Sequence, residues 1–191
     1  MRTSHKAVLV LILGMVASAA WTLDTQATPN STFAYNGKVL ALRSSAIKEV
    51  SFLKIDVYEV GLYLESASTP PDSFLASVQV KALRLRFLAD VKGKKLAEAW
   101  MKDLRLYCES GCDSLVAQGQ PIAEKLPDIP TGQIVSYVVL PDRVDVVVGQ
   151  VLIGQLEGPE ASHTILAAFL GPKAPTALRA ELLQPQVEFR R

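Results

Sequence analysis

The stretch from Phe52 to Glu65 constrains the fold of this chain more than any other part of it. It is rich in Val, Ile, Tyr and Phe, which are enriched in strands. At about 3.3 Å per residue, such a run crosses a small domain as one bent strand. Leu53, Ile55 and Val57 alternate with polar residues, whereas 60–64 is apolar on both faces. We therefore predict a strand that is covered on one face in its first half and on both faces in its second half.

The order of the predicted elements indicates an α+β fold. Strands come first, a helix pair follows, three more strands form a meander, and two helices close the chain. We therefore expect one antiparallel sheet with helices packed on one of its faces. The predicted strands are 33–35, 39–43, 52–65, 78–88, 134–140, 143–148 and 151–156, and the predicted helices are 95–107, 115–126, 158–170 and 176–183.

Two features are expected to interrupt these elements. Ser44-Ser45 breaks the run of strand-forming residues that precedes the central strand. Gly119 and Pro121 lie inside the predicted helix 115–126, and glycine lowers helix propensity while proline removes a backbone N–H donor. We therefore expect a break in the strand and an interruption in the helix.

The charge balance argues against a nucleic-acid surface. The chain of 191 residues carries a formal net charge of +1, whereas such surfaces show a strong basic excess. With 49% hydrophobic and 20% charged residues, the composition is that of a globular protein with a large core rather than of a disordered chain. Arg84 and Arg86 alternate with apolar residues, and we interpret them as a solvated basic row on one face of a strand.

The N-terminus has the layout of a secretory signal peptide. Arg2 and Lys6 precede a short apolar segment at 7–16, and small-x-small cleavage patterns follow at 17–19 and 25–27. The apolar segment is short for a membrane span of about 20 residues, so we expect cleavage and no stable span afterwards. We predict a signal peptide over 1–27, a single domain over 28–191, and a periplasmic or secreted protein.

The two cysteines of the chain, Cys108 and Cys112, are four residues apart. On a helix this spacing places their Cα atoms about 6 Å apart, within disulfide reach, and export favours oxidation. A disulfide and two free thiols both remain open, and we favour the disulfide. The chain has only two histidines, His5 and His163, and none of the common P-loop, hydrolase or zinc-protease motifs. We therefore expect no metal and no cofactor.

Three stretches of this sequence resemble the chalcone isomerase-like family, in its short bacterial exported branch. They are K-I-D-V-Y-E-V-G-L-Y-L-E, then L-R-L-R-F-L-A-D-V with K-L-A-E-A-W, and finally G-Q-L-E-G-P with A-A-F-L-G-P. Together they cover roughly residues 39 to 183. The resemblance implies an open-faced β-sandwich with a ligand cleft between the sheet and the helices, which agrees with the α+β order of the elements.

The resemblance also implies that the isomerase reaction is lost. The plant isomerases of this family use an Arg before the signature strand, a Thr within it, and a Tyr and an Asn in the helix after the next long strand. Those four positions correspond here to Lys48, Tyr58, Leu96 and Asp103. A leucine cannot hydrogen-bond a ketone or its bound water, so the resemblance points to a member without this catalysis.

The non-catalytic members include fatty-acid-binding proteins, which hold the ligand carboxylate with a basic residue and a tyrosine. Lys48 and Tyr58 match that pair, with Lys in place of the usual Arg, and Arg43 is a second candidate for the basic role. The resemblance therefore implies binding of a fatty acid or a similar amphipathic small molecule. The alternative interpretations are a solvated lysine beside a core tyrosine, an isomerase or lyase of unknown substrate, and an envelope protein-interaction module.

The signal-peptide pattern yields a direct test. N-terminal sequencing of the exported protein is expected to start between Ala20 and Thr28, because both small-x-small patterns lie just before these positions. A mature protein that begins at Met1 and stays in the cytoplasm would contradict this prediction.

Overall fold

The computed structural model describes residues 31–50, 55–66, 70 and 73–184. The predicted signal peptide, residues 52–54 of the central run and the polar C-terminal tail lie outside these ranges.

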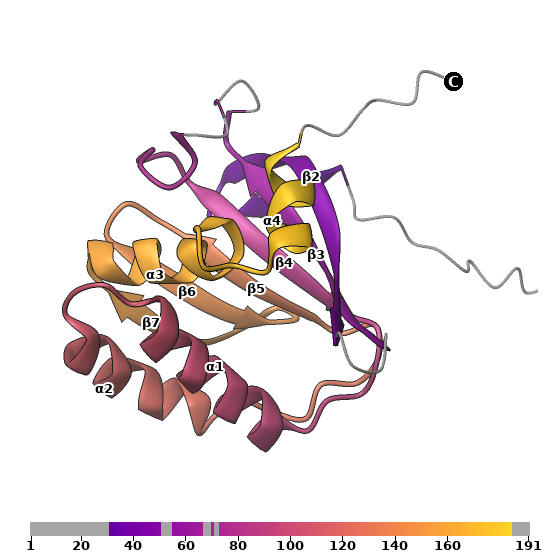
Figure 1. Cartoon of the computed structure of the whole chain (residues 1–191), viewed down its shortest axis with the longest axis vertical. Helices are drawn as coiled ribbons and strands as arrows, with labels where there is room; N and C mark the ends of the chain where they lie inside the picture. Colours follow the sequence, from indigo (N-terminus) through magenta and orange to yellow (C-terminus); the bar gives the residue numbers. More distant parts are fainter. Residues whose placement is uncertain (1–30, 51–54, 67–69, 71–72, 185–191) are drawn as a thin grey trace, which may run out of the picture.

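Seven strands form one antiparallel sheet in which each strand pairs with the next one in the sequence (Figure 1). The sheet is strongly curled, and it confirms the antiparallel arrangement predicted from the order of elements. The strands are β1 (Thr32–Tyr35), β2 (Lys38–Val50), β3 (Ile55–Leu64), β4 (Lys81–Phe87), β5 (Ile134–Val139), β6 (Arg143–Val148) and β7 (Val151–Glu157).

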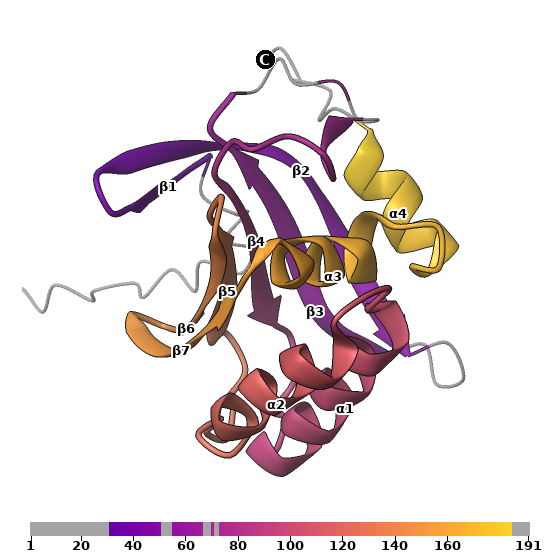
Figure 2. The same ribbon diagram turned by 90° about the vertical axis from the view of Figure 1, so that its left-hand side faces the viewer.

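The helices pack on one face of the sheet, as predicted. The central one, α3, lies over the sheet between α4 and the pair formed by α1 and α2 (Figures 1 and 2). It contacts β6, β7 and α1, while α4 contacts β2 and α2 contacts β7. The helices are α1 (Gly93–Tyr107), α2 (Cys112–Ala123), α3 (Pro159–Leu170) and α4 (Thr176–Leu183).

The second half of β3 is buried on both faces, as its apolar sequence predicts. Val60, Leu62 and Leu64 join the main core between the sheet and the helices. Tyr63 points to the opposite face and belongs to a smaller apolar cluster there. This outer cluster is completed by residues from β1, β2, β4 and β5, from the loop before β4 and from the loop after β5, namely Phe33, Tyr35, Leu40, Leu42, Val80, Ala82, Val138 and Leu140.

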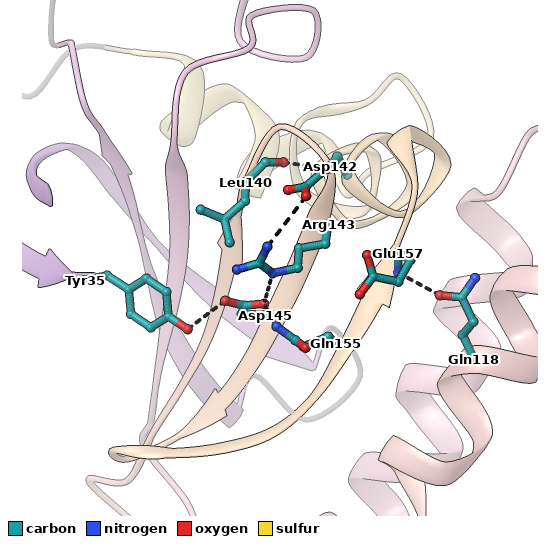
Figure 3. Close-up of polar contacts among 9 residues, drawn as sticks. Tyr35, Gln118, Leu140, Asp142, Arg143, Asp145, Gln155 and Glu157 are labelled. Atoms are coloured by element: carbon teal, nitrogen blue, oxygen red, sulfur yellow. Dashed lines mark hydrogen bonds and ion pairs between the residues drawn. The ribbon is translucent and has the colours of Figure 1, made fainter. Parts of the chain in front are cut away.

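A polar network beside this cluster ties the first hairpin to β6 (Figure 3). The Asn36-Gly37 turn, with both residues at positive φ, joins β1 to β2, as expected for a two-residue hairpin loop. The hairpin brings the Tyr35 hydroxyl to Asp145, to which it donates at 2.7 Å. Arg143 Nε at 2.9 Å and Gln155 Nε2 at 2.8 Å donate to the same buried carboxylate. Asp145 is therefore fully paired.

The predicted break at Ser44-Ser45 is wrong. β2 continues through both residues and absorbs the irregularity as a shift in register between Leu42 and Ser44. The Ser44 hydroxyl is buried and donates to the backbone oxygen of Leu182 at 2.6 Å. This bond fastens α4 onto β2, so the serine is part of the packing between helix and sheet.

The predicted interruption of the second helix is also wrong, because α2 runs through Gly119 and Pro121. A Cβ at Gly119 would lie 2.6 Å from Leu104, so glycine allows α1 to approach α2 closely. Pro121 lies in the last turn, and the residue whose carbonyl loses a partner, Ala117, is exposed to solvent. The cost of the proline is thereby reduced. A disulfide joins Cys108, at the C-terminal end of α1, to Cys112, the first residue of α2, and their Cα atoms are 5.6 Å apart.

Arg84 and Arg86 do not form a free basic row. The Arg84 guanidinium lies over the Phe33 ring, 4.4 Å from its centroid. Arg86 pairs with Glu59, which lies opposite it on β3, at 2.6 Å. Each arginine is half-buried by a residue that is distant in the sequence. The interpretation of Arg84 and Arg86 as a solvated basic row is therefore wrong.

The Asp145 network predicts that removing the Tyr35 hydroxyl group alone destabilises the protein. Tyr35→Phe is expected to lower the free energy of unfolding by about 1.5–3 kcal/mol, the range for a hydrogen bond to a charged group. Tyr107→Phe is the matched control, because the Tyr107 hydroxyl makes no hydrogen bond among the described residues. Chemical denaturation measures both. Equal losses in the two variants would contradict the role assigned to the network.

Candidate functional site

A cavity of about 90 Å³ lies between the sheet and helices α1 and α3. Its walls are mainly apolar, and its polar groups come from both the sheet and the helices. The lining residues are Tyr58, Leu85 and Tyr137 from the sheet, Leu96, Ala99, Trp100, Asp103 and Leu104 from α1, and Thr164, Ile165, Ala168 and Phe169 from α3.

The cavity has an open side and a closed side. Ala99 and Asp103 on α1 are exposed, so the cavity reaches solvent there. Trp100, Tyr137 and Thr164 are between 2% and 6% exposed and form its buried floor. A ligand would therefore enter beside α1 and meet polar groups at both the entrance and the floor.

The amphipathic pattern of α1 puts the residues that line the cavity on one face of the helix. Leu96, Trp100 and Asp103 follow one another at spacings of four and three, which puts them on one face of the helix. A residue from the loop before β5 caps the first turn of this helix, because Asp128 Oδ1 accepts from the Gly93 N–H at 2.9 Å. No acidic residue lies in the first turn of the helix, so Asp128 supplies the negative charge that stabilises a helix N-terminus.

Burial controls the protonation of the cavity groups. It raises the pKa of the Tyr58 phenol, and the charge of Asp103 adds to the effect. Burial likewise raises the pKa of Tyr137, with smaller contributions from Tyr58 and Asp103. Partial loss of solvent raises the pKa of Asp103, which the charges of Lys48 and Lys102 oppose. The two phenols are therefore neutral hydrogen-bond donors at physiological pH.

Several donors at the cavity have no partner. Within the described part of the chain, the buried Trp100 Nε1 makes no hydrogen bond. The same holds there for the hydroxyl groups of Tyr58, Tyr137 and Thr164, which line the cavity. A buried donor without a partner costs about 1–3 kcal/mol. That cost concerns the fully buried Trp100 Nε1, whereas the three hydroxyl groups are accessible and could donate to an oxygen atom of a ligand.

The structure brings two of the three predicted ligand residues together. Lys48 and Tyr58 are directly opposite each other in the β2–β3 register, so their side chains point to the same face of the sheet. Tyr58 lines the cavity, and Lys48 stands next to it without lining the cavity itself. Arg43 lies at the register shift of β2, is not among the lining residues, and its buried Nε has no partner among the described residues.

Lys81 is a second buried polar group, but it is already paired. It is 2% exposed, and burial lowers the pKa of its ammonium to about 8. Its Nζ donates to the backbone oxygens of Ser77 and Gln79. Lys81 therefore anchors the loop before β4.

The described residues show neither a metal-binding cluster nor a membrane-spanning helix. No group of three or more His, Cys, Asp or Glu side chains there is arranged to hold a metal ion. Among the helices of that part, none combines the length and the apolar character that a membrane span requires.

A sequence profile of the family described as chalcone isomerase-like matches residues 21–184. The chain belongs to this family. No curated protein sequence matches it. Among solved structures, it is similar to a fatty-acid binding protein of Arabidopsis thaliana, with a TM-score of 0.62 and 16% identity, over 80% of this chain and 95% of that chain. At this identity the match concerns the fold.

The positions that correspond to the isomerase residues of the family gather at the cavity. Tyr58, Leu96 and Asp103 all line it, and Lys48 stands beside Tyr58. The resemblance therefore predicted positions that the fold brings into one region. It missed Trp100, because its helical spacing indicated only a core residue, and it missed the floor residues Tyr137 and Thr164.

The leucine in this set predicts a lack of chalcone isomerase activity. Leu96 occupies the position of the hydroxyl donor, and such a partner is worth roughly 10²–10⁴-fold in rate. The loss of chalcone absorbance is expected to proceed at the spontaneous rate when the protein is added. Faster turnover that disappears after heat denaturation would contradict the prediction.

Proposed function

We propose that this chain is an exported, non-catalytic binding protein for an amphipathic small molecule such as a fatty acid. The observation that carries the proposal is the cavity itself, with apolar walls from α1, α3 and the sheet and with Tyr58 and Lys48 side by side at its edge. The likeness to a fatty-acid binding protein supports the same ligand class. The alternative of an interaction module would predict a filled core at this place.

The size of the cavity requires movement on binding. Its volume of about 90 Å³ is smaller than the roughly 150 Å³ of a cavity that holds one benzene ring. An acyl chain therefore enters only if α1 and α3, which contact each other, move apart. Each methylene group that is then buried contributes about 0.8 kcal/mol, so a chain of several carbons offsets the loss of this contact.

The proposed location rests on different features. The N-terminal pattern is that of a secretory signal, and the joined pair Cys108 and Cys112 suits an oxidising compartment. A periplasmic or secreted carrier of this kind would meet poorly soluble amphiphiles outside the cytoplasm.

The test separates the two polar residues. Lys48→Met is expected to weaken dodecanoate by roughly tenfold, since a hydrogen bond to a charged group is worth about 1.5–3 kcal/mol, and to leave dodecan-1-ol nearly unchanged. Tyr58→Phe is expected to weaken both ligands, because the phenol serves either head group. Calorimetric titration measures the affinities.

Lys125→Met, an exposed lysine away from the cavity, is the matched control. Equal losses for the acid and the alcohol in Lys48→Met would show that the lysine does not recognise the carboxylate. Absence of binding of either ligand to the folded wild type would overturn the proposed function and favour the interaction module.

A further inference from the structure

Among the described residues, Asp103 is the charged group that lines the cavity. It lies on the cavity face of α1, at the side that is open to solvent. Lys48 is close enough to oppose the rise in the pKa of Asp103, but across the described residues no ion pair within 4 Å joins the two. Because Lys48 does not line the cavity, a ligand inside it meets the negative charge first.

The charge of Asp103 acts on groups from several elements around the cavity. It contributes to the raised pKa of Tyr58 on β3, of Tyr107 on α1 and of Tyr137 on β5. The opposing cations are Lys48 on β2 and Lys102, an exposed residue on α1. The cavity residues of α3 carry no charge. Among the charged groups that the structure describes, the one that lines the cavity is therefore a carboxylate, and both lysines lie outside.

The uncharged polar groups of the cavity favour a ligand that both accepts and donates a hydrogen bond. The hydroxyl groups of Tyr58, Tyr137 and Thr164 line the cavity and have no hydrogen-bond partner among the described residues. A ligand hydroxyl can accept from one of these groups and donate to the Asp103 carboxylate. A ligand carboxylate has no proton to donate, so it faces Asp103 as a like charge, which disfavours both ionised groups.

We propose that the cavity prefers an uncharged, hydroxyl-bearing amphiphile over the matching carboxylate, and that Asp103 is the residue that sets this preference. The inference rests on the proposed function, because it concerns the head group of the ligand in the same cavity. Lys48 attracts a carboxylate from outside the cavity and Asp103 repels it from within. Specificity here comes from a repulsive element as well as from attractive contacts.

Three probes with the same chain and different charge test the proposal at pH 8 and low salt: octan-1-ol, octanoate and octylammonium. The wild type is expected to bind octan-1-ol more tightly than octanoate. Asp103→Asn is expected to tighten octanoate by about tenfold, which corresponds to about 1.4 kcal/mol, to weaken octylammonium, and to change octan-1-ol by less than about threefold, since the amide oxygen still accepts.

Asp113→Asn is the matched control, because Asp113 is exposed in the first turn of α2 and does not line the cavity. It is expected to leave all three affinities unchanged. Trp100 reports binding directly. The other tryptophan of the chain, Trp21, lies in the predicted signal peptide, so a protein that starts at Thr28 has the cavity residue as its sole source of tryptophan fluorescence.

The outcomes separate this inference from the proposed function. If octanoate binds as tightly as octan-1-ol and Asp103→Asn changes neither, the inference is wrong and the binding function stands. If the folded wild type, checked by circular dichroism, binds none of the three probes, both are overturned. If octanoate tightens equally in Asp103→Asn and Asp113→Asn, the effect is one of net charge and the inference is again wrong.

Discussion

Burial of the second half of β3 on both of its faces holds the two layers of this protein together. Val60, Leu62 and Leu64 face the helices, and Tyr63 faces the outer cluster that the first hairpin completes. A strand with one wet face needs only one covering layer. This strand needs two, which explains why the hairpin curls over the outer face and why Tyr35 reaches Asp145 on β6.

The same strand also organises the cavity. Its register with β2 sets Lys48 beside Tyr58, and its first half leaves Tyr58 under α1, where the side chain meets the cavity. The main core and the candidate site therefore both depend on the backbone of β3. A change that slips this strand by one residue would exchange its faces and would remove the tyrosine from the cavity together with the leucines from the core.

Local sequence patterns predicted most of the fold. Period-two alternation predicted the strands, and the Asn36-Gly37 pair between the first two is of the kind that favours a turn with positive φ. The predictions that were wrong concern residues whose conformation or exposure depends on a partner far away in the sequence. Ser44-Ser45 has the composition of a break, but the partner of Ser44 is a backbone oxygen 138 positions away. The ring beneath Arg84 likewise comes from another strand.

The candidate site was predicted only in part, for a related reason. Lys48, Tyr58 and Leu96 were recognised because family motifs mark their positions in the sequence. Trp100, Tyr137 and Thr164 carry no such mark, and each resembles an ordinary core or helix residue until the sheet and two helices are assembled around one cavity. Whether a polar atom lacks a partner is decided by its surroundings, which no local pattern contains.

The tight packing of α1 on α3 has a kinetic consequence. With a cavity of about 90 Å³, this structure would be the closed form of the proposed binding protein, and a ligand larger than the cavity would bind only the fraction of molecules that has opened. The apparent dissociation constant is the intrinsic one divided by that fraction. As ligand concentration rises, the observed association rate then levels off at the rate of helix opening. Loosening the α1–α3 contact would speed uptake and tighten binding while weakening the fold, so ligand capture and stability are opposed through one interface.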